Sequence, residues 1–446
     1  MALTQPSSPS QQHSVHRPQA AFSSGSNPTH SDPIDFDVTI AGAGIVGLTL
    51  ACALKDAGLK VGLIEAKPRE AGLSQRRAYA ITLMSEKIFR GLGVWEQMLP
   101  QIAGFNQIRL AEADYGAIVN LQPEDLGAKS LKTGKLGYVG EHCVLVQTLL
   151  DQLKDAASVT WLCPAELIQA DYQADAVTLT LAIAGDTAKL QTIRTRLLVA
   201  ADGSRSPIRT AAGIATHGWQ YWQSCVTAVI RPEKSHENIA REHFWESGPF
   251  ATLPLPDNRC QIVLTAPHAE AQQLLEVSET EFLAELDRRY GGQLGQLELL
   301  SPRFLFPVQL MQSDRYTQSR LALVGDAAHC CHPVGGQGLN MGIRDVAALA
   351  QVITAAHQRG EDIGNLQVLK RYERWRKIEN LTILGFTDLL DRIFSNHWMP
   401  LVILRRLMLQ VMRVVRPVKY LALWLMTGAA GRHPNLAKDG NFNQIH

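Results

Sequence analysis

The clearest hydrophobic pattern begins where a short run of apolar and β-branched residues, 36–41, passes through a glycine-rich turn into a helical pattern over 45–54. A second apolar run, 61–65, follows Gly58, a residue type that commonly ends helices. Strand, helix and strand in this order predict a βαβ unit. The ordered part of the chain therefore starts as an α/β protein does.

Later apolar runs indicate two kinds of sheet. The runs 179–183, 197–200 and 321–325 have the composition of buried strands. The stretch 226–308 mixes strand-like segments with one helical pattern, 279–290, and contains few βαβ signals. This pattern favours a second domain that is mostly antiparallel.

The C-terminal third is helical in pattern, over 339–358 and 366–394, and ends in a basic, apolar tail. Residues 392–438 contain eight Lys or Arg and no Asp or Glu. On a helical projection of 401–416, Arg405 lies at one end of a polar arc, and most of the remaining arc is apolar. The other polar residues of this arc are Arg406, Gln410, Arg413 and Arg416. Such a helix either contacts an anionic membrane surface peripherally or packs on the protein or a partner subunit.

Residues 1–31 are rich in Ser and Pro and lack acidic residues, a composition that buries too little apolar surface to fold. We expect a disordered tail. A transit peptide is the alternative, but its usual arginines are reduced here to Arg17 and no amphipathic period is present.

The composition of the 446 residues is that of a globular protein: 46% are apolar, 19% are charged, and the net charge is +1. This balance argues against a disordered chain and against a nucleic-acid partner. Seven scattered cysteines without a C-x-x-C suggest neither a disulfide framework nor a zinc ribbon. No apolar run approaches the roughly 18 residues of a spanning helix, so we predict a cytoplasmic protein.

The first chemical motif is Gly42-x-Gly44-x-x-Gly47 between strand and helix, with Glu65 ending the next strand. Glycines allow a tight turn and close approach of a pyrophosphate, while the carboxylate accepts hydrogen bonds from ribose hydroxyls. The motif predicts a dinucleotide site but leaves NAD and FAD both open.

A second motif decides between them. The buried run 321–325 ends at Asp326, and a glycine-rich turn from Gly336 to Leu339 opens a long helix. Asp326 can accept hydrogen bonds from a polyol, and the N–H groups at the helix start can face an anionic ring. A flavin has both a ribityl chain and a ring that becomes anionic when reduced, so we predict FAD.

The string 329–332, His-Cys-Cys-His, is metal-like in composition only. Adjacent residues do not readily point four ligands at one ion, and the flavin prediction already accounts for this segment. We therefore predict no metal site.

These motifs resemble the single-component flavin hydroxylases of aromatic rings related to para-hydroxybenzoate hydroxylase, and most closely the branch that hydroxylates ubiquinone precursors. The resemblance runs from about residue 35 to the end and rests on the first glycine motif, on 199–206 and on 325–345. It implies an α/β fold, α+β overall, with a Rossmann-like FAD-binding domain, an inserted antiparallel β-sheet substrate domain and a helical C-terminal region. The implied segments are a tail, 1–33; the FAD-binding domain, 34–105, 137–215 and 313–360; the substrate domain, 106–136 and 216–312; and the helical region, 361–446.

The resemblance also implies roles for individual residues. Four residues at the first turn and strand would hold the ADP half of FAD, with Arg77 near the pyrophosphate; Asp202 and Gly203 would serve both FAD and transient NAD(P)H docking; Asp326 would bind the ribityl chain. Gln147 stands where relatives carry a flavin-contacting Arg or Gln. The full set of implied cofactor-binding residues is Gly42, Gly44, Gly47, Glu65, Arg77, Gln147, Asp202, Gly203, Asp326, Pro333, Gly336, Gly338, Leu339 and Asn340.

The implied function is an FAD-dependent monooxygenase that uses NAD(P)H and dioxygen to hydroxylate an aromatic ring, with a polyprenylated quinone precursor as the expected substrate. Two alternatives stay open: an FAD-dependent reductase or epoxidase of an isoprenoid lipid, and a flavoprotein without turnover that supports a multi-enzyme complex. No catalytic side chain is assigned from the sequence.

Overall fold

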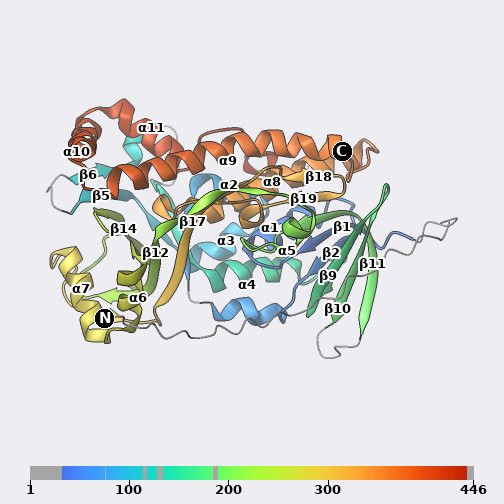
Figure 1. Cartoon of the computed structure of the whole chain (residues 1–446), viewed down its shortest axis with the longest axis horizontal. Coiled ribbons are helices and arrows are strands. Elements are labelled where there is room, and N and C mark those ends of the chain that lie inside the picture. Colours follow the sequence, from blue (N-terminus) through green and yellow to red (C-terminus); the bar gives the residue numbers. More distant parts are fainter. Residues whose placement is uncertain (1–32, 76, 114–117, 128–133, 184–188, 439–446) are drawn as a thin grey trace, which may run out of the picture. The chain divides into compact units, whose positions relative to one another are not determined.

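The computed structural model describes residues 33–75, 77–113, 118–127, 134–183 and 189–438 (Figure 1). Residues 34–446 form one compact unit, and the description that follows concerns its described part. The predicted tail, 1–33, lies outside the described residues except for Pro33.

The first sheet has a parallel centre. Its strand order is β18-β19-β11-β1-β2-β8, and the antiparallel hairpin of β9 and β10 continues from β11. The pairs β11–β1, β1–β2, β2–β8 and β11–β19 are parallel. The strands are β1 (Phe36–Ala41), β2 (Val61–Ile64), β8 (Val159–Leu162), β9 (Ala165–Tyr172), β10 (Val177–Ile183), β11 (Leu190–Ala200), β18 (Thr317–Gln318) and β19 (Leu321–Leu323).

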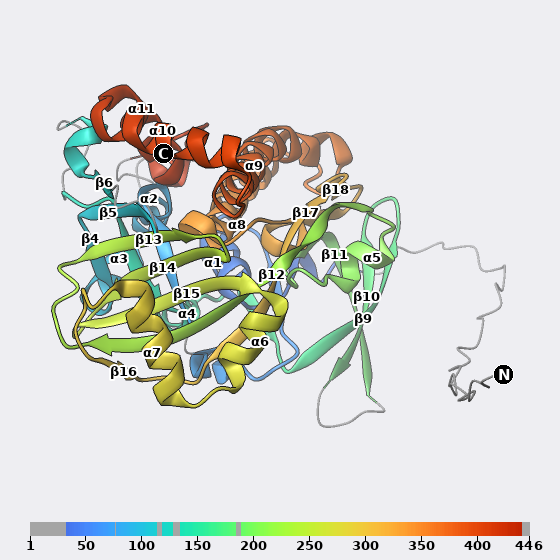
Figure 2. The same cartoon turned by 60° about the vertical axis from the view of Figure 1, so that its left-hand side comes forward.

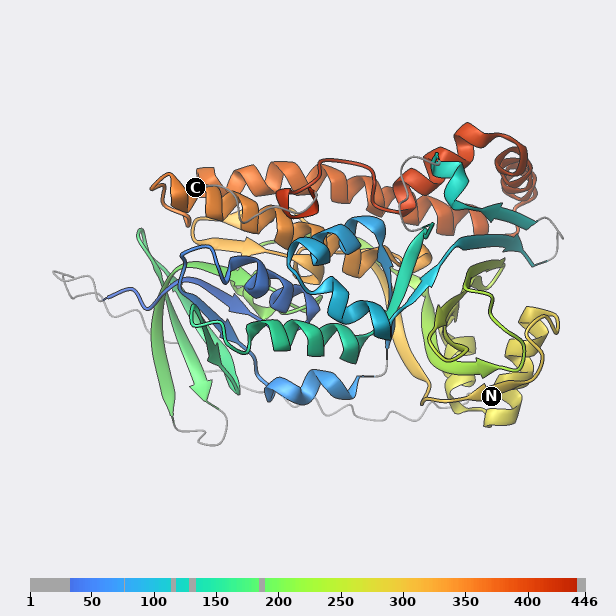
Figure 3. The ribbon, with the colours of Figure 1, turned by 180° about the vertical axis from the view of Figure 1, so that it is seen from behind.

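Several helices pack with this sheet around the main core. Helix α1 (Ile45–Leu54) contacts both α4 (His142–Leu153) and α8 (Gln337–Gln358), and α8 contacts α9 (Leu366–Phe394). Their buried faces join the strands in one apolar cluster. Figure 3 shows α1 and α4 from the back of the sheet.

The second sheet is mostly antiparallel, in the order β20-β17-β12-β15-β14-β13-β5-β6, with β16 beside β12. Helices α6 (His268–Glu276) and α7 (Glu279–Tyr290) cover one of its faces (Figure 2). Its strands are β5 (Gln107–Glu112), β6 (Ile118–Leu121), β12 (Thr216–Pro232), β13 (Ile239–Trp245), β14 (Gly248–Leu255), β15 (Arg259–Pro267), β16 (Leu297–Leu299), β17 (Phe304–Ser313) and β20 (His329–Cys330).

A third, small sheet is antiparallel. It has the order β3-β7-β4. Its strands and the remaining helices are β3 (Ala78–Thr82), β4 (Ala103–Phe105), β7 (Gly137–Glu141), α2 (Leu83–Gly91), α3 (Trp95–Met98), α5 (Pro207–Ala211), α10 (Met399–Val414) and α11 (Arg416–Met426).

The predicted α/β fold class is confirmed, and so are several elements. The strand at 36–41 and the helices at 45–54, 279–290 and 366–394 have the predicted bounds. The helix predicted from 339 begins at Gln337, directly after the αL residue Gly336.

The predicted C-terminal helix is confirmed as α10. Of its polar residues, Arg405 faces the protein while Arg413 is exposed. Arg405 is only 8% exposed. Its Nε and Nη2 donate to Glu112 Oε1 at 3.0 and 2.8 Å, and Nη1 donates to the carbonyl of Phe394 at 3.1 Å. Val402 and Leu409 are buried beside it. Arg405 therefore faces the protein, because a buried carboxylate and backbone carbonyls bind it.

Replacing Arg405 with Met should lower the free energy of unfolding by about 3 kcal/mol, because Glu112 would keep a buried charge with its closest partner removed. Urea denaturation measures the change. Arg413→Met on the exposed side of the same helix should stay within about 0.5 kcal/mol of the parent. Equal effects of the two substitutions would contradict the inward orientation.

Candidate functional site

The turn between β1 and α1 is held by backbone contacts that only glycine permits. Gly42 has φ +105°, and a Cβ there would lie 2.4 Å from the carbonyl oxygen of Ala201. A Cβ on Gly47 would lie 1.9 Å from the carbonyl oxygen of Gly42. Around Gly44, in contrast, a Cβ would meet no atom within 4 Å. Two glycines thus close the turn, and the third leaves open space in front of it.

The start of α1 has no side-chain cap, so its first N–H groups are free for a ligand. Glu65 lies beside this turn and is fixed by two backbone groups. The N–H of Ala43 donates to Oε2 at 2.9 Å and the N–H of Lys67 donates to Oε1 at 3.0 Å. The remaining lone pairs of the carboxylate can accept hydroxyl groups, as predicted for a ribose.

The segment 199–206 adjoins the first glycine motif directly, because Ala201 precedes Asp202 and touches Gly42. Asp202 Oδ2 accepts from Ser206 Oγ at 2.8 Å, while Oδ1 is buried and has no hydrogen-bond partner among the described residues. Burial raises the pKa of Asp202. An unpaired buried carboxylate oxygen at this turn is an acceptor for a ligand hydroxyl or amide.

The motif that contains Gly325 and Asp326 reaches the same place from the end of β19. A Cβ on Gly325 would lie 3.3 Å from both γ-carbons of Val46 in α1, and one on Gly342 would lie 2.8 Å from Val46 Cγ2. The first turn of α1 and the first turns of α8 are therefore in contact. Helix α8, like α1, begins at a glycine without a side-chain cap. Two uncapped helix starts converge, and both favour negative charge.

Asp326 lies in the wall of this site. Its side chain is exposed, and desolvation by the surrounding protein raises the pKa of its carboxyl group. The positive charges of His329 and Arg77 act in the opposite direction on that pKa. Arg77 itself lies 4.1 Å from the ring centre of Phe306 on β17. Arg77 and Asp326, far apart in sequence, are thus brought close together.

The glycine-rich turn before α8 carries the remaining predicted residues. Pro333, Gly338 and Leu339 are partly accessible. A Cβ on Gly338 would meet only Cys331 Sγ, at 3.8 Å. Gly336 has φ +61°, and a Cβ on it would lie 2.9 Å from the Cβ of Ala80.

The side chain of Asn340 is buried and fully hydrogen-bonded within the protein. Its Oδ1 accepts from the N–H of Thr82 at 2.9 Å and from Ser85 Oγ at 2.7 Å. Its Nδ2 donates to the carbonyls of Ala80 and Gly336 at 2.8 and 2.7 Å. The buried amide therefore ties α8 to β3 and α2, and it shapes the turn rather than offering free donors to a ligand.

Gln147 is not brought to this site by a side-chain contact. It is exposed on α4, and its Nε2 donates to Asp151 Oδ1 one turn along the same helix, at 2.8 Å.

The sequence analysis missed Asp345, which is fully buried in α8. Its Oδ2 accepts from the N–H of Gly325 at 3.1 Å and contacts His329 Nε2 at 2.6 Å, and its Oδ1 accepts from Arg376 Nε at 2.8 Å. Burial alone would raise the pKa of Asp345, but His329 and Arg376 hold it well below its usual range. In the sequence, the buried role of Asp345 is indicated only by the charged pair Arg344-Asp345 inside an otherwise apolar helical pattern.

His329 and His332 each have partners that explain them. His332 Nδ1 accepts from the N–H of Val334 at 3.2 Å, and its Nε2 lies 3.3 Å from Gln223 Oε1 and 3.4 Å from Asp391 Oδ1. Among the described residues, no group of three His, Cys, Asp or Glu side chains could hold a metal ion.

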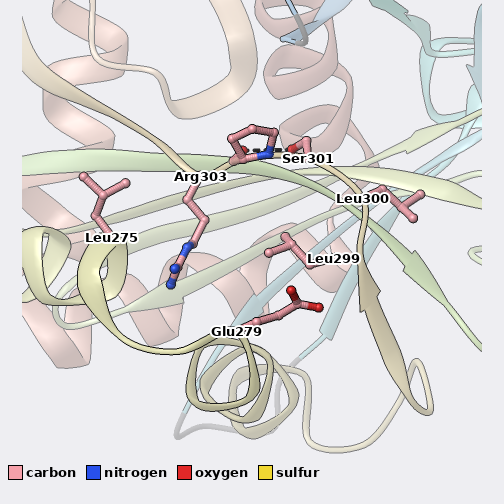
Figure 4. A pocket seen from close by; sticks show the side chains of 7 residues that line it. Leu275, Glu279, Leu299, Leu300, Ser301 and Arg303 are labelled. Carbon is pink, nitrogen blue, oxygen red and sulfur yellow. Dashed lines mark hydrogen bonds between the residues drawn. The ribbon is translucent and has the colours of Figure 1, made fainter.

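A separate surface pocket lies on the second sheet, away from these motifs (Figure 4). It is formed near the start of α7 and around β16, and none of the predicted site residues lines it. Its lining is Leu275, Glu279, Leu299, Leu300, Ser301, Pro302 and Arg303.

Residues 35–379 match the FAD binding domain family. The chain belongs to this family. It is 53% identical over 402 residues to the Synechocystis protein slr1300, covering 90% of this chain and 95% of that one. It is 38% identical over 388 residues to the ubiquinone hydroxylase UbiL of Rhodospirillum rubrum, covering 86% and 88%. The fold matches p-nitrophenol 4-monooxygenase PnpA of Pseudomonas putida with a TM-score of 0.74 at 20% identity, covering 89% and 98%.

The residues present fit FAD, and the predicted cofactor is confirmed by the family. Gly44 leaves room for a pyrophosphate beside an uncapped helix, Glu65 and the free Oδ1 of Asp202 can accept hydrogen bonds, and the carboxylate of Asp326 is accessible. The protein is a flavin-dependent oxidoreductase of the monooxygenase type, and NAD(P)H as co-substrate is typical of the family.

Gly44→Val should keep the fold but lose the flavin. The backbone at Gly44 is extended, with φ −72°, and its surroundings are empty, so valine meets no protein atom but fills the space before α1. We expect an unchanged Tm and at least about a tenfold loss of FAD affinity. Gly47→Val should instead lower Tm, because its side chain collides with Gly42. A yellow Gly44→Val protein with full flavin content would contradict this site.

Asp326→Ala should weaken FAD retention by about tenfold, the cost of a hydrogen bond to a charged group. The ratio of flavin to protein absorbance after gel filtration measures it. Asp56→Ala, at an exposed aspartate beyond α1, is the control and should retain full flavin. Equal flavin content in both variants would remove Asp326 from the site.

Proposed function

We propose that this protein hydroxylates the aromatic ring of a polyprenylated quinone precursor. The observation that carries the proposal is the meeting of three flavin motifs at Val46, Ala201 and Gly325, in a chain whose named relative is a ubiquinone hydroxylase. When bound, FAD supplies the redox chemistry that couples NAD(P)H oxidation to dioxygen activation. The protein's own residues hold the cofactor: Glu65 and Asp202 offer acceptors at one turn, and Asp326 does so at the other.

The second sheet provides the other wall of the proposed reaction chamber. The N–H of Ala78 donates to Gln261 Oε1 on β15 at 3.0 Å, and Arg77 stacks on Phe306. These contacts join the sheet to β3, which in turn bonds to Asn340 at the start of α8. A closed wall of this kind excludes water from the substrate, which a hydroxylase requires.

NADPH oxidation by the holoenzyme should accelerate at least about tenfold when 2-geranylphenol is added in air, with one hydroxylated product formed per NADPH consumed. Product formation without dioxygen would favour a reductase. Oxidation of NADPH that no phenol changes would favour the flavoprotein without turnover.

We also propose that α10 and α11 dock on an anionic membrane surface, from which a long-chain substrate enters. With Arg405 turned inward, the outward face of α10 is apolar: Ile403 is 61%, Leu407 58% and Val414 77% exposed. Trp398, Met399, Leu404, Val411, Tyr420 and Leu421 extend the exposed apolar surface. Among the described helices, none is long and apolar enough to cross a bilayer.

Basic residues adjoin this apolar surface. A recess of about 480 Å³ between β5, β6 and the C-terminal helices is lined by Arg109, Arg413 and Lys419, together with Ile118 and Asn120. Cations beside exposed apolar side chains suit the phosphate and acyl layers of an anionic bilayer. A partner protein would instead need acidic groups matched to these cations.

Leu407→Glu should reduce co-sedimentation with vesicles of phosphatidylglycerol and phosphatidylcholine at least about fivefold, because a carboxylate replaces an apolar contact. Leu190→Glu is the matched control: that leucine is 62% exposed on β11, against 58% for Leu407, and outside the apolar surface. Sedimentation that neither substitution changes, or that both reduce equally, would contradict docking through α10.

A further inference from the structure

The second sheet has two faces with different roles, and strand register assigns residues to them. Val226, Phe250 and Leu264 pack on α6 and α7. Paired residues of neighbouring strands share a face, and adjacent residues along a strand alternate. The opposite face therefore carries Thr227, Ala251 and other alternate residues, and it is the face that reaches β3 through Gln261.

Glu242 of β13 belongs to this second face. It pairs with Ala251 on β14, which pairs with Val263 on β15, which pairs with Thr227 on β12. Its neighbours at alternate positions, Ala240 and Phe244, pack in the cluster that contains Ala78. The row that begins at Glu242 thus crosses the wall of the proposed reaction chamber.

Glu242 has the properties of a group that awaits a ligand. It forms no hydrogen bond or ion pair with any residue in the part of the chain that the structure describes, and it is only partly accessible. Burial raises its pKa to about 8. Thr227 Oγ1, in the same row, is buried and also has no partner among the described residues.

Two further observations connect Glu242 with the flavin side of the chamber. The thiol of Cys225, on β12, experiences the charges of both Arg77 and Glu242, while burial raises its pKa to about 12. Arg77 in turn acts on Asp326. Glu242 therefore lies within electrostatic range of groups that border the predicted flavin site.

Glu112 on the adjacent strand provides the contrast. Leu110 of β5 pairs with Glu242, so the two side chains lie on the same face of the sheet. Glu112 is two residues after Leu110 on the same strand, and its carboxylate therefore lies on that face as well. Glu112 is 4% exposed and bound by Arg405, as a structural carboxylate should be. Glu242 lacks such a partner, so its burial costs folding free energy. Buried ionisable groups without a partner occur mainly at functional sites, which favours a functional role for Glu242.

We propose that Glu242 binds the ring hydroxyl of the aromatic substrate and takes its proton during hydroxylation; this rests on the proposed function. The O–H bond of the phenol breaks, its electron pair stays on the ring oxygen and enriches the ring, and the proton forms an O–H bond with Glu242. The carboxylic acid later returns the proton to water. A base whose pKa is close to the operating pH suits such a transfer.

Binding to the holoenzyme tests the contact without turnover. The probes are 2-geranylphenol and its methyl ether, and the signal is the change in flavin absorbance. We expect the parent protein to prefer the phenol at least about tenfold, as for a hydrogen bond to a charged group. Glu242→Leu should abolish this preference while flavin content and Tm stay unchanged. Glu246→Gln, at an exposed glutamate just after β13, should keep it.

Turnover tests the proton transfer. Glu242→Gln should slow hydroxylation of 2-geranylphenol by about a hundredfold, in the range lost with a general base. A ring-fluorinated 2-geranylphenol, which ionises more readily, should recover most of the loss. A merely structural role of Glu242 would slow both phenols alike.

The outcomes separate the two proposals. A phenol preference that survives in Glu242→Leu, or equal weakening of both probes, would overturn the role of Glu242 and leave the substrate class standing. A parent protein that binds both probes without preference would do the same. A parent protein that binds neither would contradict the substrate class, and with it the role of Glu242.

Discussion

The buried carboxylate of Asp345 is the constraint on which the second half of the site depends. It accepts the N–H of Gly325, contacts His329 and pairs with Arg376, so one charge joins the loop after β19 to α8 and α9. Such a charge is tolerated in the interior only because every lone pair has a partner. Asp326 follows Gly325 directly, so the hydrogen bond from Gly325 to Asp345 also fixes the position of Asp326.

The other half of the site depends on close backbone packing rather than on charge. Gly42 and Gly47 lie too close to neighbouring carbonyl oxygens to carry any side chain, and Val46 contacts Gly325 and Gly342. Together the two constraints bring residues from both ends of the chain to one place. One turn suits a phosphate and the other suits a polyol and a ring. A single ligand that carries all of these groups matches the two adjoining turns better than two separate ligands do.

The first βαβ unit and α9 were predictable from local patterns. Their apolar residues repeat at short intervals, and the glycines that end the elements lie only a few residues away in the sequence. The glycine motifs were predictable for the same reason. Partners distant in sequence were not: Arg405 meets Glu112 across 293 residues, and Asn340 meets Thr82 across 258. A single sequence states that a residue is polar, but not which distant group will bind it.

The C-terminal helix and the two carboxylates of the second sheet illustrate this limit. The helical projection of α10 grouped Arg405 with the other polar residues, yet Glu112 binds Arg405 on the inward side of the helix. Glu112 and Glu242 have the same side chain, and their difference arises from what the fold places around them. The role of such a residue therefore depends on the groups that surround it in the fold, and the sequence pattern does not show which groups those are.

Hydrogen exchange of the apoprotein and of the FAD-reconstituted protein tests the central claim most directly, namely that the two distant turns hold one cofactor. Addition of FAD should slow exchange in peptides covering 42–47 and in peptides covering 325–340 with the same dependence on FAD concentration. Protection of the first segment alone, with 325–340 unchanged at saturating FAD, would contradict the account.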